Sequence, residues 1–158
     1  MIRIITDSVS SITQEMAREL DIQVVTLYVN RDGVEYEDAT MDLDAFYADI
    51  YDMIDNIPTS SQPSQKLLED VFEDAARAGD EVCGIFISTG LSGAYDGALR
   101  AIRAVAARNI DFKWELVDST SCGFDEALPV LEAVAARDAG EDLHGVAQAA
   151  VDAIGRLR

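Results

Sequence analysis

The chain has 158 residues, of which 49% are hydrophobic, and this is enough for one buried core. Twelve basic against thirty acidic residues give a formal net charge of −18, which disfavours nucleic acid as a partner because such a surface repels polyphosphate. The sequence shows neither a basic leader with an apolar core nor an apolar run near the roughly twenty residues of a membrane span. With two cysteines only, we expect a protein of the reducing cytoplasm without stable membrane insertion.

The amino-terminal segment has the pattern strand, loop, helix. An apolar run over Ile2 to Ile5 ends in Thr6-Asp7-Ser8, and a helix is predicted from Thr13, which can cap it, to Leu20. Residues 23–29 are apolar and β-branched and predict a second strand. Asp32-Gly33 is the signal of a tight hairpin, which we expect to project from an edge of the sheet.

The next segment predicts two helices. Apolar residues at spacings of three and four favour one amphipathic helix over residues 42–56, ended by Pro58. Residues 59–64 read as an extended loop, and a further helix follows up to Gly79, with Pro63 at a first-turn position.

The rest of the chain alternates strands and helices. Residues 81–88 are apolar almost without interruption, as in a central strand buried on both faces. A loop over 89–93 and a helix through Val105 follow, then a strand over 114–118 and helices over about 124–139 and 143–157. This order predicts an α/β fold: a doubly wound, mainly parallel sheet with helices on both faces.

Hydroxyl side chains gather in the loops that should leave the carboxyl ends of the strands. They lie in Thr6-Asp7-Ser8, in Ser88 to Gly93, in Asp118 to Ser121, and in a fourth loop with Ser60 and Ser61. None of these loops contains lysine or arginine. Hydroxyls and the free N–H groups at a helix start suit one carboxylate better than a polyphosphate. Ligands of such sheets bind at this edge.

Helix capping is the competing explanation for these hydroxyls. We assign it to Ser8, Thr13 and Ser64. For Ser92 the choice between a cap and a ligand contact stays open, because Gly90 and Gly93 suggest special backbone angles or close approach of a ligand.

Five segments resemble, in the same order, the signature segments of the DegV family. They are Ile4-Ile5-Thr6-Asp7-Ser8, Asp32-Gly33-Val34-Glu35-Tyr36-Glu37-Asp38, Ser61-Gln62-Pro63-Ser64, Ile87-Ser88-Thr89-Gly90-Leu91-Ser92-Gly93-Ala94-Tyr95 and Val117-Asp118-Ser119. The resemblance implies a protein that binds a long-chain fatty acid and, as the FakB subunit does, presents it to a separate fatty acid kinase for acyl-phosphate formation. It implies no catalysis by this chain and no cofactor.

The resemblance also implies a set of site residues. Ser92 matches the family's carboxylate-binding serine, and Ser60 stands in place of its threonine, with Gly93 beside them. Further candidates for the pocket are Ser61, Thr6, Ser88, Ser119 and Ser121. Ala94 replaces the threonine usual after Leu-Ser-Gly, and Cys122 stands where a methionine or small residue is more usual, so affinity and chain-length preference are open.

The family has two domains. We expect residues 1–158 to correspond to its amino-terminal α/β domain, without the second domain, through truncation or a split gene. Lipid binding by this piece alone should then be weakened.

Three other functions remain as alternatives. Ser92, Asp118 and His144 follow the chain order of an α/β-hydrolase triad, which would make the chain a serine-dependent acyl hydrolase or transferase, and Cys122 could be a nucleophile at a helix start. The acidic surface or the Tyr36 hairpin could recruit a protein. Asp7 and Asp118 lack an obvious third carboxylate for a metal, so we assign no metal site and expect both to cap helices or brace loops by hydrogen bonds.

Overall fold

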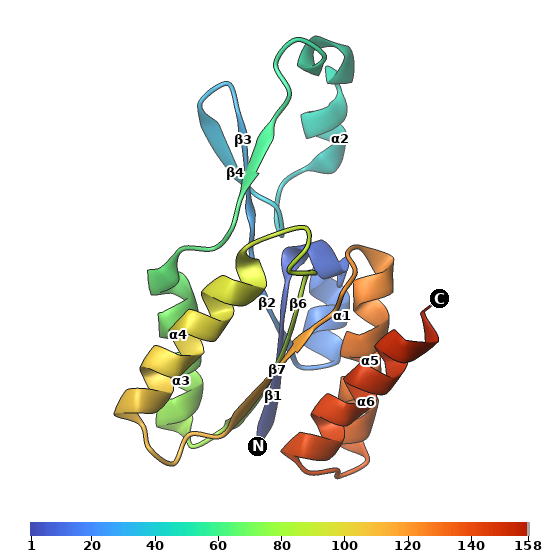
Figure 1. The fold of residues 1–158 in the computed structure, drawn as a ribbon. Coiled ribbons are helices and arrows are strands. Elements are labelled where there is room, and N and C mark those ends of the chain that lie inside the picture. Colours follow the sequence, from blue (N-terminus) through green and yellow to red (C-terminus); the bar gives the residue numbers. More distant parts are fainter. Residues whose placement is uncertain (158) are drawn as a thin grey trace.

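A four-stranded parallel sheet forms the centre of the molecule (Figure 1). The structure, a computed structural model, describes residues 1–157. The strands are β1 (Ile2–Asp7), β2 (Ile22–Val25), β6 (Glu81–Phe86) and β7 (Trp114–Asp118), in the order β2-β1-β6-β7. All three pairings are parallel, so the predicted parallel sheet is confirmed.

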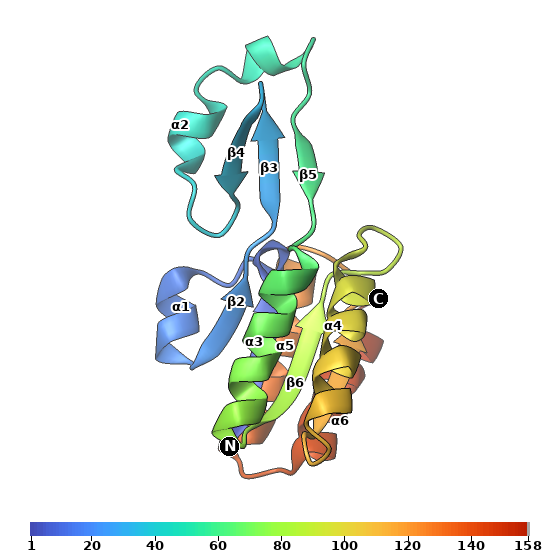
Figure 2. The same ribbon diagram turned by 90° about the vertical axis from the view of Figure 1, so that its left-hand side faces the viewer.

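Helices cover both faces of this sheet, as predicted (Figures 1 and 2). One face carries α1 (Gln14–Glu19), α5 (Phe124–Asp138) and α6 (Leu143–Arg156), and the other carries α3 (Gln65–Ala78) and α4 (Ala94–Arg108). Each face buries its own apolar cluster. The fold is therefore a doubly wound α/β domain.

The two inner strands are buried on both sides. In β1 the side chain of Ile4 joins the cluster under α5 and α6, while Ile5 joins the cluster under α3 and α4. In β6, Cys83 joins the cluster under α5 and α6, and Phe86 joins the cluster under α3 and α4. Strand neighbours point to opposite faces, so a continuous apolar run is what a central strand requires, and this prediction for β6 is confirmed.

A second, smaller sheet projects beyond the carboxyl ends of the main strands (Figure 2). It is antiparallel, in the order β4-β3-β5, and comprises β3 (Tyr28–Arg31), β4 (Val34–Glu37) and β5 (Thr59–Ser61). Residues 28–61 are called the small lobe below. Asp32 and Gly33 have φ of 54° and 78°, as a two-residue hairpin turn needs. The hairpin is confirmed, but it belongs to this separate sheet and not to an edge of the main one.

The single strand predicted over 23–29 is wrong, because the chain breaks at Thr26 and Leu27 into β2 and β3. Two hydroxyls take over the backbone bonds at the break. Ser8 Oγ accepts from Leu27 N at 2.9 Å, and Thr26 Oγ1 donates to Leu27 O at 2.8 Å. Side chains that compete for backbone groups interrupt a ladder, and here they turn the chain from one sheet into the other.

The helix predicted over 42–56 is also wrong. The structure has the short α2 (Leu43–Tyr47) and a 3₁₀ turn over Ile50–Met53. Of the predicted apolar stripe only Phe46 is buried, together with Met53 beside it, whereas Tyr51 and Ile54 are 84% and 69% exposed. An amphipathic helix gains most of its stability from packing, and the small lobe offers too little core to extend α2.

The segment before α3 also differs from the predicted loop. Thr59–Ser61 pairs with β3 as strand β5, and Pro63 precedes the helix, since Ser64 is its N-cap. The carboxyl-terminal helices lie within a few residues of their predicted ranges. None of the helices among residues 1–157 is both long enough and apolar enough to cross a bilayer.

Candidate functional site

The order of the sheet reverses between β1 and β6, which places the switch point beside the ends of these two strands. Asp7, the last residue of β1, is fully buried there. Its carboxylate accepts from Val9 N and from Ile87 N, each at 2.9 Å. One side chain therefore joins the loop after β1 to the loop after β6. The expected bracing role of Asp7 is confirmed.

The loop between β6 and α4 carries Ser92. Leu91 N and Ser92 N both donate to Ser88 O, and Ser92 Oγ accepts from Ala94 N at 3.2 Å. The Ser92 hydroxyl thus caps the first turn of α4 while its hydrogen stays available for an acceptor. Gly93, the N-cap of α4, makes no side-chain cap bond. Ser92 is half-buried and Gly93 is exposed, so both can be reached from outside.

Strand β5 meets this loop through Gln62. A Cβ added to Gly93 would lie 2.5 Å from Gln62 Oε1, so the Gln62 side chain lies directly against the Gly93 backbone. Ser60 and Ser61, just before Gln62, are exposed on β5. Gly93 has an ordinary φ of −81°. Glycine is therefore needed here for the close approach of the Gln62 side chain and not for an unusual backbone angle. The segments of Ser60 and Ser92 therefore meet at one edge.

The loop after β7 is tied to the same region. The Asp118 carboxylate accepts from Thr89 Oγ1 at 2.7 Å and from Thr120 N at 2.9 Å, so Asp118 braces two loops, as expected. Thr120 has a φ of 53°, in the left-handed region that a β-branched residue rarely adopts. Such strain is held by surrounding bonds and is common at functional sites.

Most of the other hydroxyls proposed for the pocket, those of Thr6, Ser88, Ser119 and Ser121, are buried or half-buried. Thr6 and Ser119 are fully buried, and Ser119 Oγ is engaged with the backbone of Ser121. Ser88 Oγ accepts from Gly90 N at 3.1 Å. These side chains shape the loops from below. Thr13 and Ser64 cap α1 and α3 as predicted, whereas Ser8 holds the β2–β3 break described above.

A buried glutamate lies beneath these loops, and sequence reasoning missed it. Glu126, in the first turn of α5, has no exposed surface, and neither of its carboxyl oxygens has a hydrogen-bond partner among residues 1–157. Burial, together with the carboxylates of Asp7 and Asp118, raises the pKa of Glu126 to about 9. Burial likewise raises the pKa of Asp7 to about 6. Glu126 therefore holds its proton at neutral pH.

The hydrolase alternative is not supported, because the structure does not assemble its triad. His144 is an exposed residue whose Nδ1 lies 3.2 Å from Glu115 on β7. Asp118 is bonded to Thr89 and Thr120, and Ser92 to the start of α4. Cys122 is exposed and unpaired. Within residues 1–157, no group of three or more His, Cys, Asp or Glu side chains is arranged to hold a metal ion.

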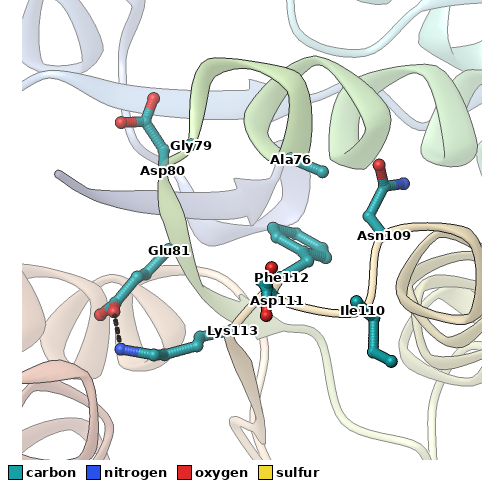
Figure 3. Close-up of a pocket in the computed structure, with 9 residues that line it drawn as sticks. All are labelled: Ala76, Gly79, Asp80, Glu81, Asn109, Ile110, Asp111, Phe112 and Lys113. Atoms are coloured by element: carbon teal, nitrogen blue, oxygen red, sulfur yellow. Dashed lines mark hydrogen bonds and ion pairs between the residues drawn. The ribbon is translucent and has the colours of Figure 1, made fainter.

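Two cavities differ in their position relative to the candidate site. A cavity of about 410 Å³ lies at the opposite, amino-terminal edge of β6 and β7, where Lys113 pairs with Glu81 beside Phe112 (Figure 3). A cavity of about 300 Å³ lies in the small lobe and is lined by Ser60, Phe46 and Met53 among others. Only the second lies beside a predicted site residue.

Curated relatives share the chain's sequence over most of its length. A protein from Clostridium perfringens, described as DegV domain-containing, is 31% identical over 147 residues, which cover 93% of this chain and 52% of the relative. A DegV domain-containing 15.5 kDa protein from Staphylococcus aureus is 30% identical over 121 residues, which cover 77% of this chain and 82% of the relative. The chain spans about half the length of most curated relatives it matches.

Solved structures agree with the sequence matches. A fat acid (stearic acid)-binding protein from Eubacterium ventriosum matches with a TM-score of 0.83 and 26% identity over 94% of this chain and 51% of the other. A structure described as fatty acid binding of a DegV family protein from Thermus thermophilus matches with a TM-score of 0.82 and 27% identity over 97% and 53%. The family model described as "Uncharacterised protein, DegV family" matches residues 1–157. The chain therefore belongs to the DegV family.

Proposed function

We propose that this chain binds a long-chain fatty acid by its carboxylate at the edge where β5 meets the β6–α4 loop. The packing of Gln62 against the Gly93 backbone carries the proposal, because Ser60 lies two residues before Gln62 and Ser92 lies directly before Gly93. The stearic-acid-binding relative from Eubacterium ventriosum supports it.

The site would hold one negative group without a cation. Ser92 and Ser60 each have a hydroxyl hydrogen to donate, and the first turn of α4 offers N–H groups and the positive end of a 15-residue helix. Gly93 lets the Gln62 side chain pack against the backbone at the start of α4. A carboxylate accepts such bonds more strongly than a neutral group does, which favours an ionised acid over an ester or alcohol.

The acyl chain would lie on apolar side chains near this edge. Leu91, next to Ser92, is 65% exposed, and Phe124, at the start of α5, is 70% exposed. The small-lobe cavity beside Ser60 offers further apolar surface from Phe46 and Met53. Because the chain spans about half the length of its matched relatives, we propose that residues 1–158 act as the family's amino-terminal domain and bind lipid more weakly than a two-domain member.

We further propose that a separate ATP-dependent kinase takes the bound acid to acyl phosphate, while this chain only presents it. The site offers donors for a carboxylate, and within residues 1–157 Ser92 and His144 are engaged with other partners and not with each other. When a fatty acid kinase subunit, ATP and stearic acid are combined, acyl phosphate should form only with this chain present. Ester hydrolysis or acyl phosphate produced by the chain alone would contradict this role.

Lipid occupancy tests the binding role directly. After delipidation and incubation with stearic acid, native mass spectrometry should show bound acid on the wild type, and Ser92→Ala and Ser60→Ala should each bind about tenfold more weakly or worse, the loss of a hydrogen bond to a charged group. Ser64→Ala is the matched control from the same segment, since its hydroxyl only caps α3. Equal occupancy in all four proteins would refute the assigned contacts.

A further inference from the structure

The Asp7 carboxylate is placed to control the loop that carries Ser92. It is fully buried, and each of its oxygens accepts one backbone N–H, from Val9 and from Ile87. The β1–β6 ladder ends with the pair Thr6 and Ile85, so the bond to Ile87 extends the connection beyond the ladder. Ile87 directly precedes Ser88, whose carbonyl oxygen accepts from Leu91 N and Ser92 N. A chain of bonds thus runs from Asp7 to Ser92.

The groups around Asp7 determine whether Asp7 or Glu126 carries the negative charge. Glu126 from α5 lies in the same buried cluster, and neither its carboxyl oxygens nor Thr6 Oγ1 has a well-formed hydrogen bond. The nearby Thr6 hydroxyl nevertheless lowers the pKa of Glu126, against the larger effect of burial. Asp38, from the segment after β4, also acts on Asp7, and Asp118 at the end of β7 acts on Glu126. No cation among residues 1–157 contributes to either group's shift. Two N–H donors stabilise a carboxylate at Asp7 and none does so at Glu126, so the proton stays on Glu126.

We propose that Asp7 is a positioning residue: its ionised carboxylate holds the Ser88–Gly93 loop, and protonation of this carboxylate loosens the loop and weakens the binding of a fatty-acid carboxylate. The hold on the loop stands on the contacts alone, whereas the effect on binding rests on the proposed function. A protonated carboxyl keeps one good acceptor and gains a donor, so it cannot satisfy both Val9 N and Ile87 N.

The Asp7 carboxylate changes its protonation state near neutral pH. Burial raises the pKa of Asp7 to about 6, so the ionised, loop-holding form dominates at pH 7 and becomes the minority at pH 5. If only that form binds well, the apparent dissociation constant rises by the inverse of its population, which is about tenfold at pH 5.

The first experiment needs no lipid. In a ¹⁵N–¹H NMR titration from pH 8 to pH 5, the amide signals of Val9, Ile87 and Ser92 should move together with a midpoint near 6. In Asp7→Asn, whose side chain cannot ionise, these movements should vanish while the fold stays intact. Glu126→Gln is the matched control, buried in the same cluster, and should leave the titration in place. Amides of Ile87 and Ser92 that do not titrate in the wild type would overturn the inference.

The second experiment adds two probes, stearic acid and the sulfonate of equal chain length, whose head group stays ionised throughout. Wild type and Glu126→Gln should bind the sulfonate about tenfold more weakly at pH 5 than at pH 7, and Asp7→Asn should bind it weakly at both. Binding that is independent of pH and of Asp7 would refute the positioning role and leave fatty-acid binding standing. If no protein binds either probe, the proposed function fails, and the NMR titration alone decides whether Asp7 holds the loop.

Discussion

Replacing Glu126 by glutamine should change how the stability of the fold depends on pH. In the folded chain, burial raises the pKa of Glu126 from 4.5 to about 9, so between these values the native state keeps a proton that the unfolded chain has released. The free energy of unfolding then falls as pH rises, by about 1.4 kcal/mol per pH unit. At pH 7, about 2.5 units above 4.5, this costs about 3 kcal/mol. Glutamine cannot ionise in either state and avoids this cost.

The slope is the test, because a buried amide without partners has its own pH-independent cost of about 1–3 kcal/mol. Urea unfolding at pH 5, 6, 7 and 8 should show the variant gaining on the wild type by about 1.4 kcal/mol per unit. Glu126→Leu, which removes the acid without adding an amide, should show the same slope with a different offset. The free energy of unfolding can be plotted against pH for the wild type and both variants. If the three curves run parallel from pH 5 to pH 8, a neutral Glu126 is refuted.

Two glycine substitutions test the packing and strain around the site. Thr120→Gly should raise the free energy of unfolding by about 1 kcal/mol, because glycine adopts the φ of 53° without strain; a lower melting temperature would contradict stored strain at this loop. Gly84→Ala should destabilise the fold by about 1–3 kcal/mol, since its Cβ would collide with the Leu116 side chain. A melting temperature equal to that of the wild type would contradict this tight packing between β6 and β7.

Most of the main sheet could be predicted because its strands are short apolar segments between clear loops. Glu81–Phe86 is apolar on both faces and Trp114–Asp118 is bounded by loops rich in turn residues, so local pattern and tertiary position agree. The small lobe could not be predicted in the same way. Its strands are three or four residues long and mostly exposed, and their pairing depends on contacts between β3 and β5 some thirty residues apart.

Part of the candidate site could also be read from the sequence. Loops after parallel strands share an edge, and this rule places the loops of Asp7, Ser88–Gly93 and Asp118 together, whereas Ser60 lies on the antiparallel strand β5, which the rule does not cover. The roles of Asp7 and Glu126 depend on burial that no local pattern reveals. A glutamate in a first helical turn usually complements the helix dipole at the surface, and only the packing of α5 on β1 shows that Glu126 lies inside.

The position of the bound head group tests the central claim most directly. Stearic acid labelled with ¹³C at its carboxyl carbon can be added to the ¹⁵N-labelled chain, and contacts between that carbon and backbone amides can be mapped by NMR. We predict the strongest effects at Ser60, Ser92 and Gly93, with loss of the carboxyl shift in Ser92→Ala. Effects centred instead on residues 109–113, at the opposite edge of the sheet, would contradict the account.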